Sequence, residues 1–103
     1  MGAKVTIKVE LPNGKPVPGA AITGTNHDAW SSKHSVWKAS TNQEGLYEFA
    51  DLDTGTLGDR YTFDVVSRDV AGGTWVGSAS QRVSRPLTLT ITLQKEPSPA
   101  GQP

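Results

Sequence analysis

The sequence predicts an all-β protein, a single antiparallel β-sandwich of about seven strands. Apolar and polar residues alternate with a period of two along much of the chain, and no segment shows the period of an amphipathic helix. Glycines, prolines and asparagines interrupt this alternation about every ten residues, as expected for a sandwich of short strands. The chain has 103 residues and no cysteine, so its apolar core must stabilise one domain without disulfides.

The first predicted strand spans residues 4–11, KVTIKVEL. Its apolar residues share one face: Val5, Ile7, Val9 and Leu11. Charged residues and a threonine take the other face, which predicts a half-buried strand with a solvent side. Pro12 ends the strand because it has no amide hydrogen for the ladder. Two further prolines hold the chain extended, and Gly19 permits a bend into a second strand over residues 20–25.

The middle of the chain alternates less regularly. Residues 26–35 are polar with a single large aromatic, which predicts a loop. Two strands follow, at residues 36–41 and 45–52, joined by a predicted hairpin over residues 42–45 in which Gly45 takes a positive φ. One face of the second of these strands carries Tyr47 and Phe49.

Three more strands complete the predicted fold. A glycine-punctuated loop at residues 53–60 leads into a strand over residues 61–68, and its inward residues are Tyr61, Phe63 and Val65. A turn at residues 69–73 leads into a weaker strand over residues 74–83. The last strand, residues 86–94, alternates most regularly. Its inward residues are Leu87, Leu89, Ile91 and Leu93, and Thr88, Thr90 and Thr92 face outward.

Charge and hydropathy exclude several classes of partner. Ten basic and ten acidic side chains cancel, so no basic excess is available for nucleic acid or for an anionic membrane surface. No apolar run approaches the roughly 20 residues that membrane insertion as a spanning helix requires. The Pro-rich residues 95–103 predict a linker or tail after a domain at residues 1–94, and we expect the chain to be a module of a larger protein.

Three phrases of the sequence, taken together, resemble a known family. These are GKPVPGAAITGT, STNQEGLYEFADL, and YTFDV followed by LTLTITL. In this order they resemble the carboxypeptidase regulatory-like domains, which have a transthyretin-like (prealbumin-like) sandwich. The resemblance covers residues 4–94 and implies a Greek-key sandwich of the transthyretin-like or Ig-like kind. The chain departs from the family pattern at Asn42, where Asp is more usual, and in the longer stretch DTGTLGDRY.

Relatives of this type that carry chemistry have features that this chain lacks. Collagen-binding B-type adhesin domains form an isopeptide bond from an inward lysine, whereas Lys4 and Lys8 fall on the polar face of the first predicted strand. The hydroxyisourate hydrolases end in Tyr-Arg-Gly-Ser, whereas this chain ends in EPSPAGQP. In the carboxypeptidases the catalytic zinc belongs to a neighbouring domain. The resemblance therefore implies neither catalysis nor a cofactor in this module.

The tryptophans are the candidate ligand-binding residues: Trp30, Trp37 and Trp75. Aromatic faces stack on sugar rings, so an exposed row of tryptophans on a sandwich would suit polysaccharide binding. The alternative is that one or two of them pack in the core, where the indole N–H would need a partner. Trp30 lies in the polar loop, and Trp37 could point either way.

Other polar clusters have compositions that are also ordinary in loops and turns. His27, Asp28 and His34 crowd one loop, but their spacing matches no metal signature. Three aspartates, which are Asp51, Asp53 and Asp59, surround a glycine-rich turn and could supply oxygen ligands to calcium, although aspartate is also common in turns. No Gly-x-Ser-x-Gly elbow marks a nucleophilic serine.

These observations favour a non-catalytic accessory module over an enzyme. We expect it to act as a spacer and an interaction surface for neighbouring domains of a larger, extracellular or cell-surface protein. The alternative hypothesis is a carbohydrate-binding module that uses the three tryptophans. The accessory function rests on analogy at the level of the fold.

Overall fold

The computed structural model describes residues 2–28, 36–54, 58–70 and 73–96, and this part of the chain is all-β. Its eight strands are β1 (Gly2–Glu10), β2 (Ala21–Asn26), β3 (Val36–Ser40), β4 (Leu46–Asp53), β5 (Asp59–Val70), β6 (Gly73–Val83), β7 (Leu87–Thr92) and β8 (Gln94–Lys95). Within these residues no helix is long and apolar enough to cross a membrane.

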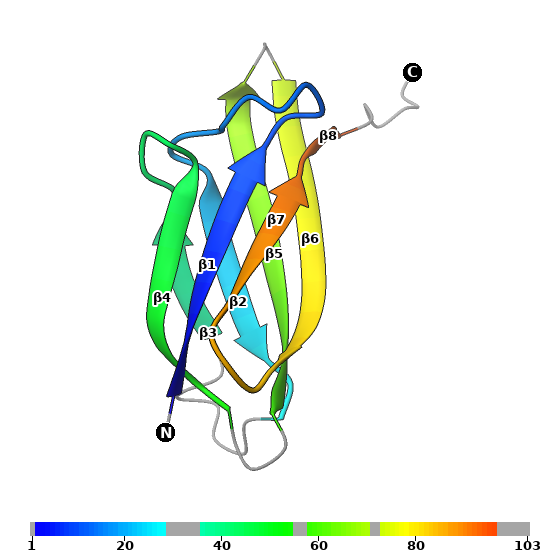
Figure 1. Cartoon of the computed structure of the whole chain (residues 1–103). Helices are drawn as coiled ribbons and strands as arrows, with labels where there is room; N and C mark the ends of the chain where they lie inside the picture. The colour runs from blue at the N-terminus through cyan, green and yellow to red at the C-terminus, as the bar shows by residue number, and fades with distance from the viewer. Residues whose placement is uncertain (1, 29–35, 55–57, 71–72, 97–103) are drawn as a thin grey trace.

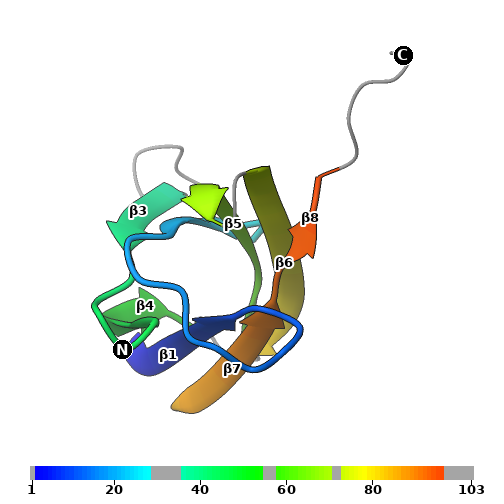
Figure 2. The same cartoon turned by 90° about the horizontal axis from the view of Figure 1, so that it is seen from above.

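The strands form two sheets that face each other across the core (Figures 1 and 2). The smaller sheet has three strands in the order β4-β1-β7, and the larger sheet has five in the order β3-β2-β5-β6-β8. The predicted all-β, sandwich-like architecture is confirmed.

The prediction that every pairing is antiparallel is wrong for one pair of strands. β1 and β7 are parallel, with six residue pairs that run from Val5–Leu87 to Glu10–Thr92. Alternation with a period of two is the same in parallel and antiparallel strands, so the sequence pattern does not report direction. A parallel pair needs a long crossover, and here strands β2 to β6 lie between the two partners in sequence.

The predicted hairpin between the third and fourth strands is also wrong. The turn itself forms, because Gly45 has a φ of 76° and its amide donates to Asn42 O over 3.0 Å. However, β3 pairs with β2 and β4 pairs with β1, so the two arms join different sheets. Turn residues specify that the chain reverses; they do not specify which sheet each arm joins.

The last predicted strand is divided between the sheets. β7 ends at Thr92, and the two residues of β8 pair with β6 in the larger sheet, which raises the strand number from seven to eight. Lys95, expected in the linker, pairs with Trp75, and the Glu96 amide donates to Thr74 O over 2.8 Å. The remaining residues of the predicted tail, 97–103, lie outside the described part of the chain.

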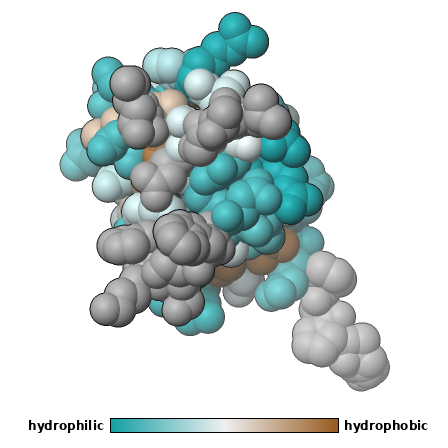
Figure 3. Space-filling model, turned by 90° about the horizontal axis from the view of Figure 1, so that it is seen from below, coloured by the Kyte–Doolittle hydropathy of each residue, from teal (hydrophilic) through white to brown (hydrophobic). Residues whose placement is uncertain are grey.

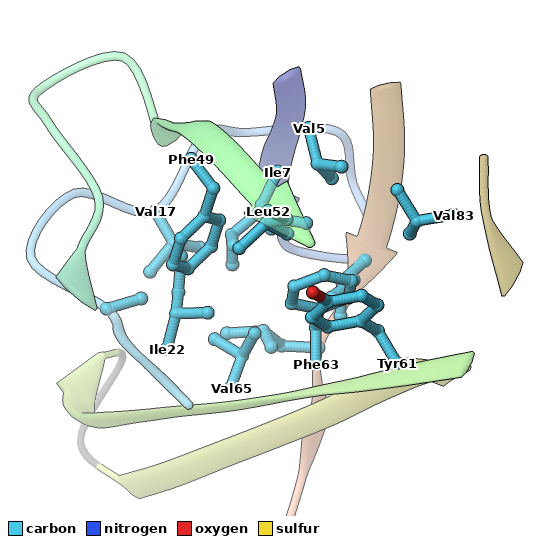
Figure 4. Packing of buried hydrophobic residues seen from close by; sticks show 14 of the residues in the cluster. Val5, Ile7, Val17, Ile22, Phe49, Leu52, Tyr61, Phe63, Val65 and Val83 are labelled. Atoms are coloured by element: carbon cyan, nitrogen blue, oxygen red, sulfur yellow. The ribbon is translucent and has the colours of Figure 1, made fainter. Parts of the chain in front are cut away.

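The core contains the inward residues that alternation predicted (Figure 4). Tyr61 and Phe63 rise from β5 toward Val5 and Leu52 of the other sheet, and the two rings stack with centroids 5.7 Å apart. The fully buried side chains include Val5, Ile7, Val9, Ile22, Tyr61, Phe63, Val65, Val83 and Leu93.

Some inward residues of the edge strands are only partly buried. Ile91 is 2% exposed, but Leu87 and Leu89 of β7 are partly buried because β7 is the edge of its sheet. Tyr47 of the edge strand β4 is likewise 37% exposed, although its ring contacts that of Phe49 at a centroid distance of 4.8 Å.

Buried Thr41, which follows β3, forms hydrogen bonds with the corner between β1 and β2, the segment that contains Pro16 and Pro18. The Thr41 hydroxyl donates to Val17 O over 2.6 Å and accepts from the Ala20 amide over 2.9 Å. Val17 and Ala20 are themselves buried, so these backbone groups have no access to bulk water. The Gly19 amide also donates to Thr41 O, and the Thr41 amide to Ala20 O, each over 3.0 Å. Thr41 therefore fixes the corner between β1 and β2 to the end of β3 through both its side chain and its backbone.

Candidate interaction surface

The two described tryptophans do not form a common surface. Trp37 lies opposite Gly24, whose backbone faces the Phe63 ring, and its own ring lies 5.6 Å from that of Tyr61. Trp75 is partly buried and packs against the core from β6. β3 and β6 are three strand spacings apart, about 14 Å across the sheet. Trp30 lies outside the described residues.

The outer face of the larger sheet carries a dense set of hydroxyl groups. The odd-numbered residues Tyr61, Phe63 and Val65 of β5 face the core, so its even-numbered residues face outward. Residues directly opposite each other share a face, so the partners of these even-numbered residues on β2 and β6 face outward too. The hydroxyl residues of this outer face include Thr23, Thr25, Thr62, Ser78 and Ser80. The outer face is therefore polar around Thr62 and Asp64, whereas Val66 and Val76 form an apolar part farther along β5 and β6.

The polar surface becomes a shallow hollow at the end where β5 begins. The hollow has a volume of about 450 Å³ and is lined by His27, Arg60, Tyr61, Thr62, Ser80, Gln81 and Arg82. His27 Nε2 lies 2.7 Å from Thr62 Oγ1, which lies 3.0 Å from Ser80 Oγ. This row runs from His27, the first residue after β2, across β5 to β6, and the described surface at that end is largely hydrophilic (Figure 3).

An ion pair borders the hollow. Arg60 Nη2 lies 2.9 Å from Asp28 Oδ1, and the Arg60 amide donates to Asp28 Oδ2 over 2.7 Å. The hydrogen bond from the Arg60 side chain, followed by that from its amide, lowers the pKa of Asp28 from 3.8 to about 2. Asp28 therefore stays ionised and offsets the charge of Arg60 at neutral pH.

The second arginine of the hollow has a different partner. Arg82 Nη1 donates to the carbonyl oxygen of Gly58 over 2.7 Å. Among the described residues, Arg82 forms no ion pair with a carboxylate. A carbonyl satisfies a donor but does not neutralise a charge, and Asp28 acts on Arg82 only at longer range, so the guanidinium can still bind an anionic or hydroxyl-rich group.

Buried Asn26 positions the residues beside the hollow. Its Nδ2 donates to Asp59 Oδ2 over 2.9 Å and to Tyr61 OH over 3.1 Å, and its Oδ1 accepts from the Asp28 amide over 2.8 Å. Asn26 is 3% exposed, so these hydrogen bonds replace those that water would have made. They join the end of β2 to the start of β5.

The hollow does not have the geometry of a hydrolytic triad. A base that activates a serine or threonine needs a third group to orient it, commonly a carboxylate. Within the described residues His27 has Thr62 as its hydrogen-bond partner and has no carboxylate partner. The arrangement suits binding, in which hydroxyl, imidazole and guanidinium groups exchange hydrogen bonds with a ligand.

The sequence-based metal hypotheses find no assembled site. Asp51 lies exposed on β4 in the smaller sheet, whereas Asp59 lies on β5 in the larger sheet and accepts a hydrogen bond from Asn26. Among the described residues no group of three or more histidine, aspartate or glutamate side chains could hold a metal ion. His34 and the side chain of Asp53 lie outside what the structure describes.

Sequence reasoning did not single out Arg60, Thr62, Ser80 or Arg82. The cross-strand register brings these residues together, because it places Arg60 opposite Arg82 and Thr62 opposite Ser80. Neither pair is close in sequence. Comparison with protein-family models and with curated proteins finds no match for this chain.

Proposed function

We propose that this chain is a non-catalytic accessory module of a larger secreted or surface protein, a rigid spacer that also offers an interaction surface. We further propose that it is a carboxypeptidase regulatory-like domain with transthyretin-like, Greek-key connectivity. Strand order supports the connectivity: the chain passes from one sheet to the other after β1, β3, β4, β6 and β7.

The observation that carries the spacer function is the placement of the two ends. β1 begins at one end of the sandwich, and β7 and β8 finish at the opposite end (Figure 1). This follows from the parallel pairing of β1 with β7, because the strands that enter and leave the module run in the same direction. Domains attached to the two ends would therefore be held apart by the length of the strands.

The interaction surface is the outer face of the larger sheet with its hollow. Its side chains stand on β2, β5 and β6, which pair along most of their length, so a partner would meet a preformed surface. Arg82, which has no carboxylate in direct contact among the described residues, and the row from His27 to Ser80 favour a partner with carboxylates or hydroxyls. A neighbouring domain of the parent protein is the partner we propose.

The spacer function is tested by measuring the distance between the ends. Lys4 and Lys95 are exposed, and the chain has no cysteine, so cysteines introduced at these two positions can be labelled with a donor and an acceptor dye. We expect a single narrow distribution of energy transfer in single molecules. A broad distribution in native buffer would contradict a rigid spacer.

Carbohydrate binding remains the alternative, with Trp30, Trp37 and Trp75 as its residues. Trp37 and Trp75 pack against the core at separate places, so a common stacking platform would depend on Trp30. Titration of a broad glycan panel, followed by tryptophan fluorescence, decides between the two functions. A saturable shift that is lost in Trp30→Ala would favour the alternative; no response would remove it.

A further inference from the structure

β1 and β7 are joined by a ladder that lies between the two ends of the module. Six consecutive residue pairs connect them, from Val5–Leu87 to Glu10–Thr92. The Leu93 amide extends the ladder by donating to Glu10 O over 2.9 Å. β1 is the central strand of its sheet, and β7 is an edge strand that, within the described part of the chain, pairs in that sheet with β1 alone.

Tension applied to the two ends must pass through this ladder. A pull on the start of β1 and on the end of β7 moves the two strands past each other along their common axis (Figure 1). In a parallel ladder the hydrogen bonds are evenly spaced, so such a pull strains all of them at the same time. Before the ladder is loaded, the pull must break the pairs Trp75–Lys95 and Val76–Gln94 and the hydrogen bond from the Glu96 amide to Thr74 O.

One side of the ladder is sealed by the core. The inward residues of β1, which are Val5, Ile7 and Val9, are fully buried, and Ile91 of β7 is 2% exposed. Leu87 and Leu89 of β7 are partly buried, so the core side of the ladder is mostly closed to water, whereas its outer side is open where Lys8 and Thr90 lie opposite each other. Sliding the strands by one residue would also move these inward side chains out of register with the core.

We infer that the β1–β7 ladder is a mechanical clamp, and that the module resists unfolding when tension is applied along its long axis. The biological use of such a clamp rests on the proposed spacer function, since only a spacer in series with other domains is pulled at both ends. The mechanical property itself belongs to the fold and can be measured on the isolated chain.

The test compares two directions of pulling on the same ladder. Cysteine handles at Lys4 and Thr92 load β1 against the far end of β7, which shears the ladder. Handles at Lys4 and Thr88 load the neighbouring ends of the two strands, which opens the ladder from one end. All three side chains are exposed, and the chain has no other cysteine that could react.

We expect the variant with handles at Lys4 and Thr92 to unfold at a force at least about threefold higher than the variant with handles at Lys4 and Thr88. In the first variant all six residue pairs must break together, whereas in the second they break one after another. Equal forces, or a higher force for the opening pair, would overturn the inference. Chemical denaturation of both variants serves as the control, since forced unfolding depends on the pulling direction and equilibrium stability does not. Equal forces would not contradict the spacer function, which the energy-transfer measurement tests separately.

Discussion

Gly45 combines backbone strain with a close approach, and both can be measured by substitution. Its φ of 76° lies in the left-handed region, where an L-residue costs about 1–2 kcal/mol. A Cβ at this position would also lie 2.7 Å from Val9 O and 3.0 Å from Pro16 Cβ. Forcing extra atoms into such a packed site costs typically about 1–3 kcal/mol. We therefore expect Gly45→Ala to lower the free energy of unfolding by about 2–5 kcal/mol.

Gly14 provides a matched control for that substitution. Its φ of 88° is also left-handed, but a Cβ there would have nothing within 4 Å. Gly14→Ala should therefore cost only the strain of about 1–2 kcal/mol, and the loss of unfolded-state entropy is the same in both variants. Urea denaturation followed by circular dichroism gives both free energies. Equal losses would refute the claim that the turn before β4 packs against the end of β1.

Three further substitutions test the corner, the core and the border of the hollow. Thr41→Val should lower the free energy of unfolding by about 1–3 kcal/mol because it leaves two buried backbone groups without a partner, while Thr90→Val on the solvent face should change it little. Ile91→Ala should cost about 2–5 kcal/mol and Thr90→Ala far less; equal costs in urea denaturation would contradict the assignment of faces on β7. The hydrogen bond from Arg60 lowers the pKa of Asp28 from 3.8 to about 2. The difference in the free energy of unfolding between the unaltered chain and Asp28→Asn should therefore be complete above about pH 4 and should disappear as the pH falls to about 2. A difference between these two proteins that stays constant from pH 6 to pH 2 in thermal melts would refute that assignment.

Local alternation predicted the buried faces well because burial and the β-pleat have the same period. Val5, Ile7 and Val9 in β1, and Tyr61, Phe63 and Val65 in β5, are buried as predicted. Alternation carries no information about which strands become neighbours. The parallel β1–β7 pair and the assignment of β3 and β4 to different sheets therefore depend on tertiary packing.

The candidate surface was harder to predict for the same reason. His27 and Asp28 were singled out as polar loop residues, but their partners, Thr62 and Arg60, lie more than thirty residues away in sequence, at separations of 35 and 32. Trp37 is a candidate stacking residue because of its large ring, yet its position opposite Gly24 places it on the core side of the sheet. Residue type indicates what a side chain can do, whereas cross-strand register decides which side chains meet.

The direction of β7 relative to β1 is the feature on which the spacer and the clamp both depend, and disulfide formation measures it directly. Thr6 lies opposite Thr88, and Glu10 lies opposite Thr92, so cysteines at either of these two pairs should oxidise to a disulfide without loss of the fold. The crossed pairs, Thr6 with Thr92 and Glu10 with Thr88, are four residues out of register, about 13 Å, and should stay reduced. Disulfides in the crossed pairs and free thiols in the direct pairs would show that the strands are antiparallel, which would contradict both the spacer and the clamp.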